Sequence, residues 1–295
     1  VEAQRVAVVY GNTLQTFYAI DAAHRLGVPA IWNPRESEPW QDYFRQFPDA
    51  VAARALGCYE KAYRVVFVAH ATARACAALD TRHNFTVVHN GLDRARLAVG
   101  TAGADRAGAR TELGLARDDL ALLLLGTVCE RKGQHDFARA LARLDHLVAA
   151  RVRAFIVGDR PSAYSLALHA LVDALPAERR RRVEIVAETE DVGRHFLAAD
   201  AFVCTSRVES YPRVILEAMA FGLPIVTTPV FGIREQVREG VNGLFYEPGD
   251  AATLARQLAA IVGDDALRAR LAANAVPSLD ALTGFDEMVE RYARI

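Results

Sequence analysis

The chain has few lysines and few cysteines, and it lacks both a long apolar run and a large net charge. Its formal net charge is −1 over 295 residues, so the bulk electrostatics do not favour nucleic acid as a partner. No apolar run approaches the ~20 residues needed to span a bilayer, and the N-terminus lacks a secretory-signal pattern. We therefore expect a cytoplasmic protein.

The few cysteines, histidines and lysines bear on metal binding and on candidate site residues. The four cysteines are widely spaced and form no close pair, so we expect reduced core thiols and no zinc site. The histidines are scattered without spacing of four, no Asp-x-Asp occurs, and no metal is expected. Almost all cationic side chains are arginines, which makes Lys61 and Lys132 worth separate attention.

Strand and helix patterns alternate along the chain and predict two α/β domains with parallel sheets. The second half predicts strands at residues 120–125, 153–157, 183–186, 201–205, 224–227 and 244–246, with a helix at 134–147 after the first. The first half predicts strands at 5–9, 30–32, 65–68 and 86–88, with helices near 16–26, 49–60 and 72–78. Such alternation indicates doubly wound, Rossmann-like folds.

A segment without apolar periodicity separates the two halves. Residues 98–110 are rich in Ala, Gly and Thr, which predicts an exposed connection or a flexible insertion between the halves. We therefore predict an N-terminal domain over 1–97, a second domain over 98–280, and a C-terminal helix in 281–295 that packs back toward the first domain.

The most informative stretch lies between two glutamates eight residues apart, Glu209 and Glu217. From Val214 to Phe221 every residue except Glu217 is apolar, which predicts a buried helix with one carboxylate that needs a partner. One interpretation is an ion pair with Arg213, four residues earlier on the same helix face.

The other interpretation is an anion site. Pro212 suits a first helical turn, so Glu209 and Ser210 should lie beside the free N–H groups of the helix N-terminus, which attract phosphate. If the intervening residues are helical, the two carboxylates lie about 12 Å apart, a distance that a nucleotide-sugar diphosphate spans.

Loops at 127–133, 158–161 and 206–212 all follow predicted strands, so they should converge on one crevice at the carboxyl edge of the sheet. The first loop carries Arg131 and Lys132 beside a helix N-terminus, and two cations with free amides suit a diphosphate. Solvated loop cations are the alternative.

The spacing of Glu209 and Glu217, followed by Ala-Met-Ala-x-Gly-x-Pro, resembles the E-x7-E signature of family-4 (group 1) retaining glycosyltransferases with the GT-B fold. The resemblance implies that Glu209 contacts the donor sugar and Glu217 the ribose. The donor-binding residues carried over or expected nearby are Gly126, Thr127, Gly158, Glu188, Thr189, Ser210, Tyr211, Pro212, Arg213 and Val214. The stretch from Val87 to Asp93 resembles the segment that joins the two domains in this family.

Two departures from the family pattern limit the resemblance. Thr127 stands where the family has a basic residue, for which Arg131 is a candidate substitute, and Lys132-Gly133 matches the later Lys-Gly. No glycine-rich opening loop precedes Tyr10, so the resemblance covers the last part of the acceptor domain and all of the donor domain. Val1 in place of Met agrees with a lost start, and the resemblance leaves room for peripheral membrane contact through that missing part.

On the acceptor side, the charged segment from Arg35 to Trp40 follows a predicted strand. Arg35, Glu36 and Trp40 are candidate acceptor contacts, although the histidine frequent here in the family is absent. The alternative is a solvated loop on which Trp40 packs as a lid.

The resemblance implies transfer of a sugar from a nucleotide-diphosphate donor to a saccharide or lipid-linked acceptor, with retention of configuration and without a cofactor. Glu209, Lys132 and Arg131 are then the catalytic candidates. A nucleotide-sugar epimerase or hydrolase on the same fold, or a non-catalytic nucleotide- or saccharide-binding module, are the alternatives.

Overall fold

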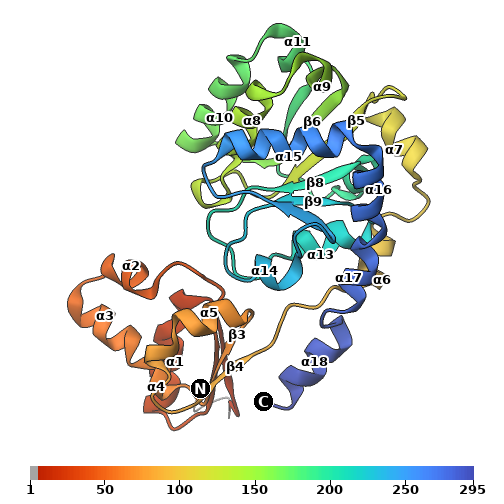
Figure 1. The fold of residues 1–295 in the computed structure, drawn as a ribbon. Coiled ribbons are helices and arrows are strands. Elements are labelled where there is room, and N and C mark those ends of the chain that lie inside the picture. Colours follow the sequence, from red (N-terminus) through yellow and green to blue (C-terminus); the bar gives the residue numbers. More distant parts are fainter. Residues whose placement is uncertain (1–5) are drawn as a thin grey trace.

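The structure, a computed structural model, describes residues 6–295 as two lobes, each built on a parallel β-sheet (Figure 1). Strands β1 to β4 form the sheet of the N-terminal lobe, and strands β5 to β10 form that of the C-terminal lobe. Both sheets are parallel throughout and flanked by helices, which confirms the predicted α/β class with two Rossmann-like units.

The N-terminal lobe has the strand order β1-β2-β3-β4. Its strands are β1 (Val9–Asn12), β2 (Ala30–Asn33), β3 (Arg64–Phe67) and β4 (Phe85–Val87), and its helices are α1 (Phe17–Arg25), α2 (Trp40–Arg45), α3 (Asp49–Leu56), α4 (Cys58–Lys61) and α5 (His70–Ala75). A short 3₁₀ turn, η1 (Leu14–Thr16), precedes α1.

Three predictions in this lobe were wrong in their bounds. The strand expected at 5–9 has its first residue outside the described residues. The observed strand β1 lies further along the chain, because it pairs Val9 with Ala30 and Asn12 with Asn33. The helix expected at 49–60 is divided at Gly57 into α3 and α4. The helix expected at 72–78 begins and ends earlier, as α5.

The C-terminal lobe has the strand order β10-β9-β8-β5-β6-β7, which reverses direction between β5 and β8. Its strands are β5 (Leu120–Leu125), β6 (Val152–Asp159), β7 (Val183–Ala187), β8 (Ala201–Cys204), β9 (Ile225–Thr227) and β10 (Gly243–Phe245). Its helices are α8 (Gln134–Arg143), α9 (His146–Arg151), α10 (Ala163–Asp173), α11 (Ala177–Arg180), α12 (Gly193–Ala198), α13 (Arg213–Ala220), α14 (Ile233–Gln236), α15 (Ala251–Gly263) and α16 (Asp265–Ala273). In open parallel sheets, ligands bind where the strand order reverses.

Strand β5 shows why this sheet is covered on both faces. Leu122 and Leu124 pack into the core beneath α8, α10 and α15, whereas Ala121 and Leu123 pack into the core beneath α12 and α13. Alternate residues of a strand point to opposite faces, so a continuous apolar run specifies a sheet buried on both sides. The predicted helix at 134–147 is two helices, because Asp145 ends the run by capping α9 through the N–H of Leu147 at 2.9 Å.

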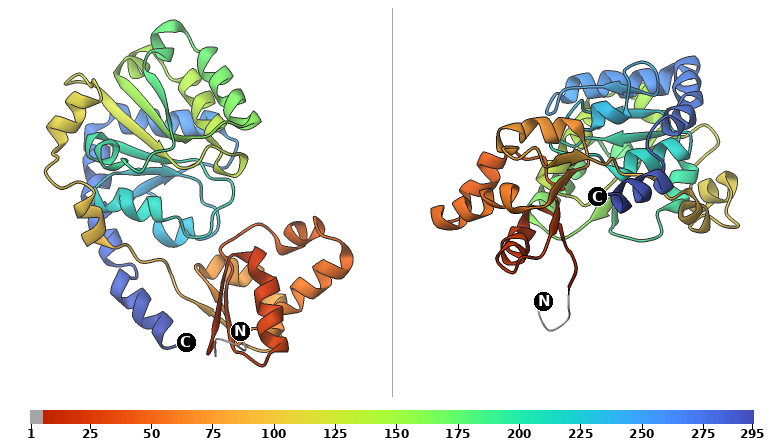
Figure 2. Two further views of the ribbon diagram at one scale, coloured as in Figure 1. Left: turned by 180° about the vertical axis from the view of Figure 1, so that it is seen from behind. Right: turned by 90° about the horizontal axis from the view of Figure 1, so that it is seen from below.

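Two segments connect the lobes (Figure 2). The first carries α6 (Arg94–Val99) and α7 (Arg106–Glu112), and most of residues 98–110 are exposed, as predicted, although residues 106–110 belong to helix α7. Asp105 caps that helix by accepting the N–H of Gly108 at 2.7 Å, and Ala109 is buried.

The second connection, α17 (Ala275–Asp280) and α18 (Phe285–Ala293), runs back toward the N-terminal lobe. There Arg291 donates to the carbonyl of Val87 at 2.7 Å, and the Tyr292 hydroxyl accepts from Asn33. The domain boundaries at 97 and 280 stay predictions. No helix within residues 6–295 is long and apolar enough to cross a membrane.

Candidate active site

The loops that follow β5 and β8 are held together at the reversal of strand order. Gly133 has a left-handed φ of 66°, and a Cβ there would lie 2.2 Å from the carbonyl oxygen of Thr205, so only glycine permits this approach. The Thr205 hydroxyl donates to the Lys132 carbonyl at 2.7 Å, and the N–H of Arg207 donates to the Arg131 carbonyl at 2.7 Å. The backbone therefore fixes the turn η3 (Glu130–Lys132) beside the loop that carries Glu209.

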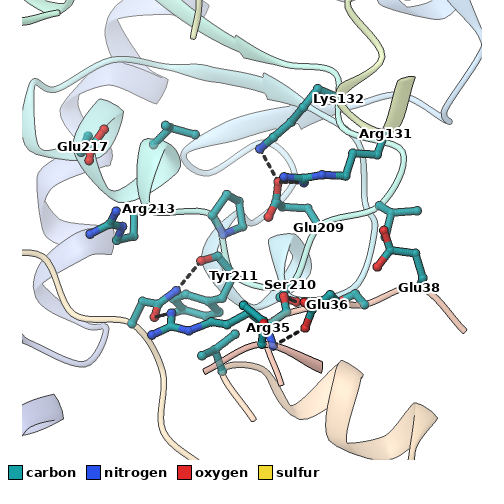
Figure 3. A pocket seen from close by; sticks show the side chains of 17 residues that line it. Arg35, Glu36, Glu38, Arg131, Lys132, Glu209, Ser210, Tyr211, Arg213 and Glu217 are labelled. Carbon is teal, nitrogen blue, oxygen red and sulfur yellow. Dashed lines mark hydrogen bonds and ion pairs between the residues drawn. The ribbon is translucent and has the colours of Figure 1, made fainter. Parts of the chain in front are cut away.

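The two predicted cations converge on Glu209 (Figure 3). Lys132 forms an ion pair with the Glu209 carboxylate, and Arg131 Nη1 lies 3.3 Å from the same Oε2 atom. The side chains of Lys132 and Glu209 are only 16% and 13% exposed, so the pair is partly shielded from water. A charge-assisted cluster of this kind can exchange one carboxylate for another anion.

Helix α13 begins at Arg213, with Pro212 at its N-cap and no side chain capping it. The prediction that Pro212 lies in the first turn was one residue early. Because the chain from Glu209 to Pro212 is not helical, the helical rise does not set the separation of the two glutamates.

The entrance of α13 offers free hydrogen-bond donors. Within residues 6–295, the backbone N–H groups of Ser210, Tyr211, Arg213 and Val214 have no acceptor. Free N–H groups at a helix N-terminus, together with the helix dipole, bind phosphate well. This donor array lies between the two glutamates of the signature, as the resemblance implies.

Glu217 sits half-buried on α13. Burial raises the pKa of its carboxyl, and the nearby charge of Arg213 opposes that rise. Among the described residues no ion pair joins Glu217 to Arg213, so that interpretation was wrong. A half-buried carboxylate without a partner needs a hydrogen-bond donor, which a sugar hydroxyl would supply.

A cavity of about 520 Å³ lies between the lobes and contains these groups. The C-terminal lobe contributes Arg131, Lys132, Val208, Glu209, Ser210, Tyr211, Pro212, Arg213, Val214 and Glu217, and the N-terminal lobe contributes Thr13, Arg35, Glu36, Ser37, Glu38, Val68 and Asn90. The cavity therefore combines most of the predicted donor residues with two of the three predicted acceptor residues.

The charged loop after β2 forms the N-terminal wall of this cavity. Arg35 donates through Nη1 to Asn90 Oδ1 at 2.7 Å and through Nε to Asn12 Oδ1 at 3.2 Å. Glu36 accepts the N–H groups of Leu14 and of Arg35 at 2.7 and 2.9 Å, so its carboxylate also holds the loop in shape.

A second cavity, of about 420 Å³, shares Arg213 and Glu217 with the first. Its further lining mixes apolar and charged side chains, among them Leu92, Val192 and Phe196, and Asp93, Arg96 and Glu190. Apolar side chains with a few polar groups suit a heterocyclic ligand. The two cavities thus meet at Glu217, with Arg131 and Lys132 in the first and this mixed lining in the second.

Several predicted site residues line neither cavity and stay predictions as ligand contacts. Gly126 and Gly158 pack on each other, because a Cβ on Gly158 would lie 2.5 Å from the Gly126 carbonyl oxygen. Glu188 pairs with Arg160, and Trp40 packs against the N-terminal core. Thr127 and Thr189 also lie outside the lining.

Six residues that line the first cavity were not among the predicted site residues: Thr13, Ser37, Glu38, Val68, Asn90 and Val208. Ser37 and Asn90 contact the signature itself, since the hydroxyls of Ser37 and Ser210 lie 2.5 Å apart and Asn90 Nδ2 donates to the Tyr211 carbonyl at 2.7 Å. The sequence did contain a signal for Asn90, because the stretch from Val87 to Asp93 resembles the segment that joins the two domains in this family.

Two Rossmann-like lobes with a cavity at the reversal of strand order define a GT-B fold, and comparisons with known proteins agree. The structure of HepE from Anabaena in complex with UDP and glucose matches with a TM-score of 0.84 and 25% identity, over 99% of this chain and 78% of that chain. Residues 105–276 match the family described as glycosyl transferases group 1. The chain therefore belongs to the group 1 glycosyl transferase family.

Two curated relatives are similar in sequence. The lipopolysaccharide core biosynthesis glycosyltransferase LpsE of Rhizobium meliloti is 34% identical over 187 residues, which are 63% of this chain and 52% of that protein. The D-inositol 3-phosphate glycosyltransferase 1 of Catenulispora acidiphila is 34% identical over 216 residues, 70% of this chain and 50% of that protein. The chain spans about half the length of these relatives.

Proposed function

We propose that this chain is a retaining glycosyltransferase that binds a nucleotide-diphosphate sugar in its C-terminal lobe. The observation that carries the proposal is the array of free N–H groups at the entrance of α13, whose residues line the same cavity as Lys132 and Arg131. In this arrangement the diphosphate lies on the amides, the nucleoside extends past Glu217 into the second cavity, and the sugar lies toward Glu209.

In the proposed reaction an acceptor hydroxyl oxygen forms a bond to the anomeric carbon while the bond from that carbon to the diphosphate oxygen breaks. The electron pair of the broken bond leaves on the nucleoside diphosphate, which accepts the hydroxyl proton on the same face of the sugar. Lys132, Arg131 and the amides stabilise the negative charge that develops on the leaving oxygen. Positioning and electrostatics supply the rate enhancement, and no metal or cofactor takes part.

The N-terminal wall would then hold the acceptor. Arg35 and Glu38 line the cavity opposite the donor residues, and a polyol or saccharide offers hydroxyls for both charges. The relatives named as a lipopolysaccharide core biosynthesis glycosyltransferase and as a D-inositol 3-phosphate glycosyltransferase support an acceptor with several hydroxyl groups, free or lipid-linked.

Titration calorimetry with UDP, GDP and ADP tests the donor site. One nucleotide should bind, and Glu217→Ala should weaken that binding by about tenfold, the loss expected for a charged hydrogen bond to ribose. Glu112→Gln, an exposed change on α7 that touches neither cavity, serves as the control.

Product analysis tests the reaction class. The matching nucleotide sugar, incubated with a panel of polyols and saccharides, should release nucleotide and give a glycoside of unchanged anomeric configuration by NMR. Free sugar alone would indicate a hydrolase, and a changed sugar still attached to nucleotide would indicate an epimerase. Binding of nucleotide without any product would indicate a binding module, and binding of none would overturn the proposal.

A further inference from the structure

Glu235 on α14 reaches across the junction between the lobes. Its Oε1 accepts the N–H of Ala71 at 2.8 Å, and its Oε2 accepts the N–H of His70 at 3.0 Å. These two N–H groups open helix α5 of the other lobe, where Ala69 stands at the N-cap and has no side chain that could accept them. A carboxylate of one lobe therefore caps a helix of the other.

The same carboxylate holds an imidazole. His89 Nε2 lies 2.9 Å from Glu235 Oε2, and both side chains are less than one-fifth exposed. Burial raises the pKa of Glu235, but hydrogen bonds from His89 and from the backbone of Ala71 and His70 outweigh it, so the pKa is lowered. The carboxylate thus stays ionised and available to all three donors.

His89 in turn lies flat against Tyr211, a residue of the signature. The two rings stack with centroids 4.7 Å apart and an interplanar angle of 18°. The next residue, Asn90, donates to the Tyr211 carbonyl at 2.7 Å. The adjacent pair His89 and Asn90 therefore grips both the ring and the backbone of Tyr211, whose N–H belongs to the free donor array.

The cluster has the composition of a cation site, since ligand atoms of His70, His89 and Glu235 lie within 4.8 Å of one another. Both carboxylate oxygens, however, already accept N–H donors, and a cation would have to displace the His89 proton. The stacking of His89 on Tyr211, a residue of the signature, assigns the cluster a different role.

We propose that Glu235 and His89 form a clamp across the lobe junction that positions Tyr211, and with it the N–H groups that receive the donor diphosphate. Both are positioning residues, because neither lines the cavity. The inference rests on the proposed function. It predicts that the clamp strengthens binding of the diphosphate and leaves binding of the nucleoside portion, on the far side of Glu217, unchanged.

The test compares affinities for the nucleoside diphosphate and the nucleoside monophosphate of the base that the wild type prefers. Glu235→Gln should weaken diphosphate binding and lower kcat/KM, each by about tenfold, as expected for loss of charge-assisted hydrogen bonds. The affinity for the nucleoside monophosphate should stay unchanged. Equal loss of both affinities would assign the residue a general structural role and overturn the clamp.

Two histidine variants separate the arms of the clamp and cover the case in which Glu235→Gln fails to fold. His89→Phe keeps a ring over Tyr211 but loses the bond to Glu235, whereas His89→Gln keeps an N–H donor but loses the stacked ring. Each should reduce the preference for diphosphate over monophosphate. His169→Ala is the matched control, because His169 Nε2 also lies 2.9 Å from a carboxylate, that of Asp159, within one lobe.

The outcomes distinguish the two proposals. If the wild type binds no nucleoside diphosphate, the proposed function falls and the clamp falls with it. If the wild type binds and the three variants match it, the clamp alone is overturned. A chelator should leave wild-type affinity unchanged, and a loss that Zn²⁺ restores would assign the cluster to a cation and overturn the clamp.

Discussion

The two walls of the central cavity present different chemical groups. The C-terminal wall presents backbone N–H groups and two cations, fixed by short turns such as that at Gly133. The N-terminal wall presents side chains, four of them on the loop of residues 35–38 and the others from Thr13, Val68 and Asn90. Backbone donors recognise a group common to all nucleotide donors, whereas side chains can change without altering the fold. The difference assigns general chemistry to one wall and acceptor choice to the other.

Among the changes to the two walls, loss of Lys132 should have the largest effect on activity. Lys132→Ala should lower turnover by about a hundredfold, because the leaving diphosphate loses one of the two cations proposed to stabilise it. Lys61→Ala is the matched control, since Lys61 is the other lysine of the chain and pairs with Asp21 in the N-terminal lobe. Initial rates of nucleotide release measure both, and similar rates in the two variants would contradict the role of Lys132.

The turn that holds Lys132 can be broken without touching its charge. Gly133→Ala should lower the free energy of unfolding by about 3 kcal/mol, from the left-handed backbone and from contact with the Thr205 carbonyl. Gly114→Ala is the matched control, because Gly114 has φ of 61° but open space around its Cβ position, and it should cost only about 1 kcal/mol. Urea unfolding measures both, and equal losses would refute the contact.

Glu217→Gln should raise the stability of the C-terminal wall and weaken its binding of nucleotide. Burial raises the pKa of Glu217, so the folded state binds this proton more tightly than the unfolded state does. The stabilising contribution is full below the unfolded pKa and is lost as pH rises through the folded pKa. The variant should therefore gain stability relative to wild type as pH rises above 4.5, while it binds nucleotide about tenfold more weakly. Urea unfolding at several pH values checks the sign, and a constant difference would contradict it.

The smallest effect is expected at the N-terminal wall. Arg35→Ala should raise the acceptor KM by about fivefold, the loss of a partly exposed charged hydrogen bond, and leave nucleotide affinity unchanged. Arg45→Ala, an exposed change on the neighbouring helix α2, is the control. Calorimetry and acceptor titrations measure the two quantities separately. A fall in nucleotide affinity would contradict the division between the walls.

Local signals were sufficient for the strands of the C-terminal lobe and for its signature. The run Leu120 to Leu125 became a strand with the predicted bounds, and the signature placed Glu209 and Glu217 on one cavity. Bounds failed where capping decided them, as at Asp145, or where a partner strand set the register, as at Val9.

The missed site residues share one physical cause. Thr13 and Ser37 reach the cavity only because the lobes pack together, and nothing in their immediate neighbours encodes that packing. The clamp was missed for the same reason, since Glu235 and His89 are separated by 146 residues. Long-range contacts of single polar side chains leave no periodic pattern to read.

The return of α18 to the N-terminal lobe has a mechanical consequence. The polypeptide crosses between the lobes twice, and Arg291 fastens the second crossing to the carbonyl of Val87, where the first crossing begins. Because the two crossings are joined at this point, a change in the angle between the lobes would have to bend both segments together. Asn90, three residues after Val87, holds the carbonyl of Tyr211 close to that joint.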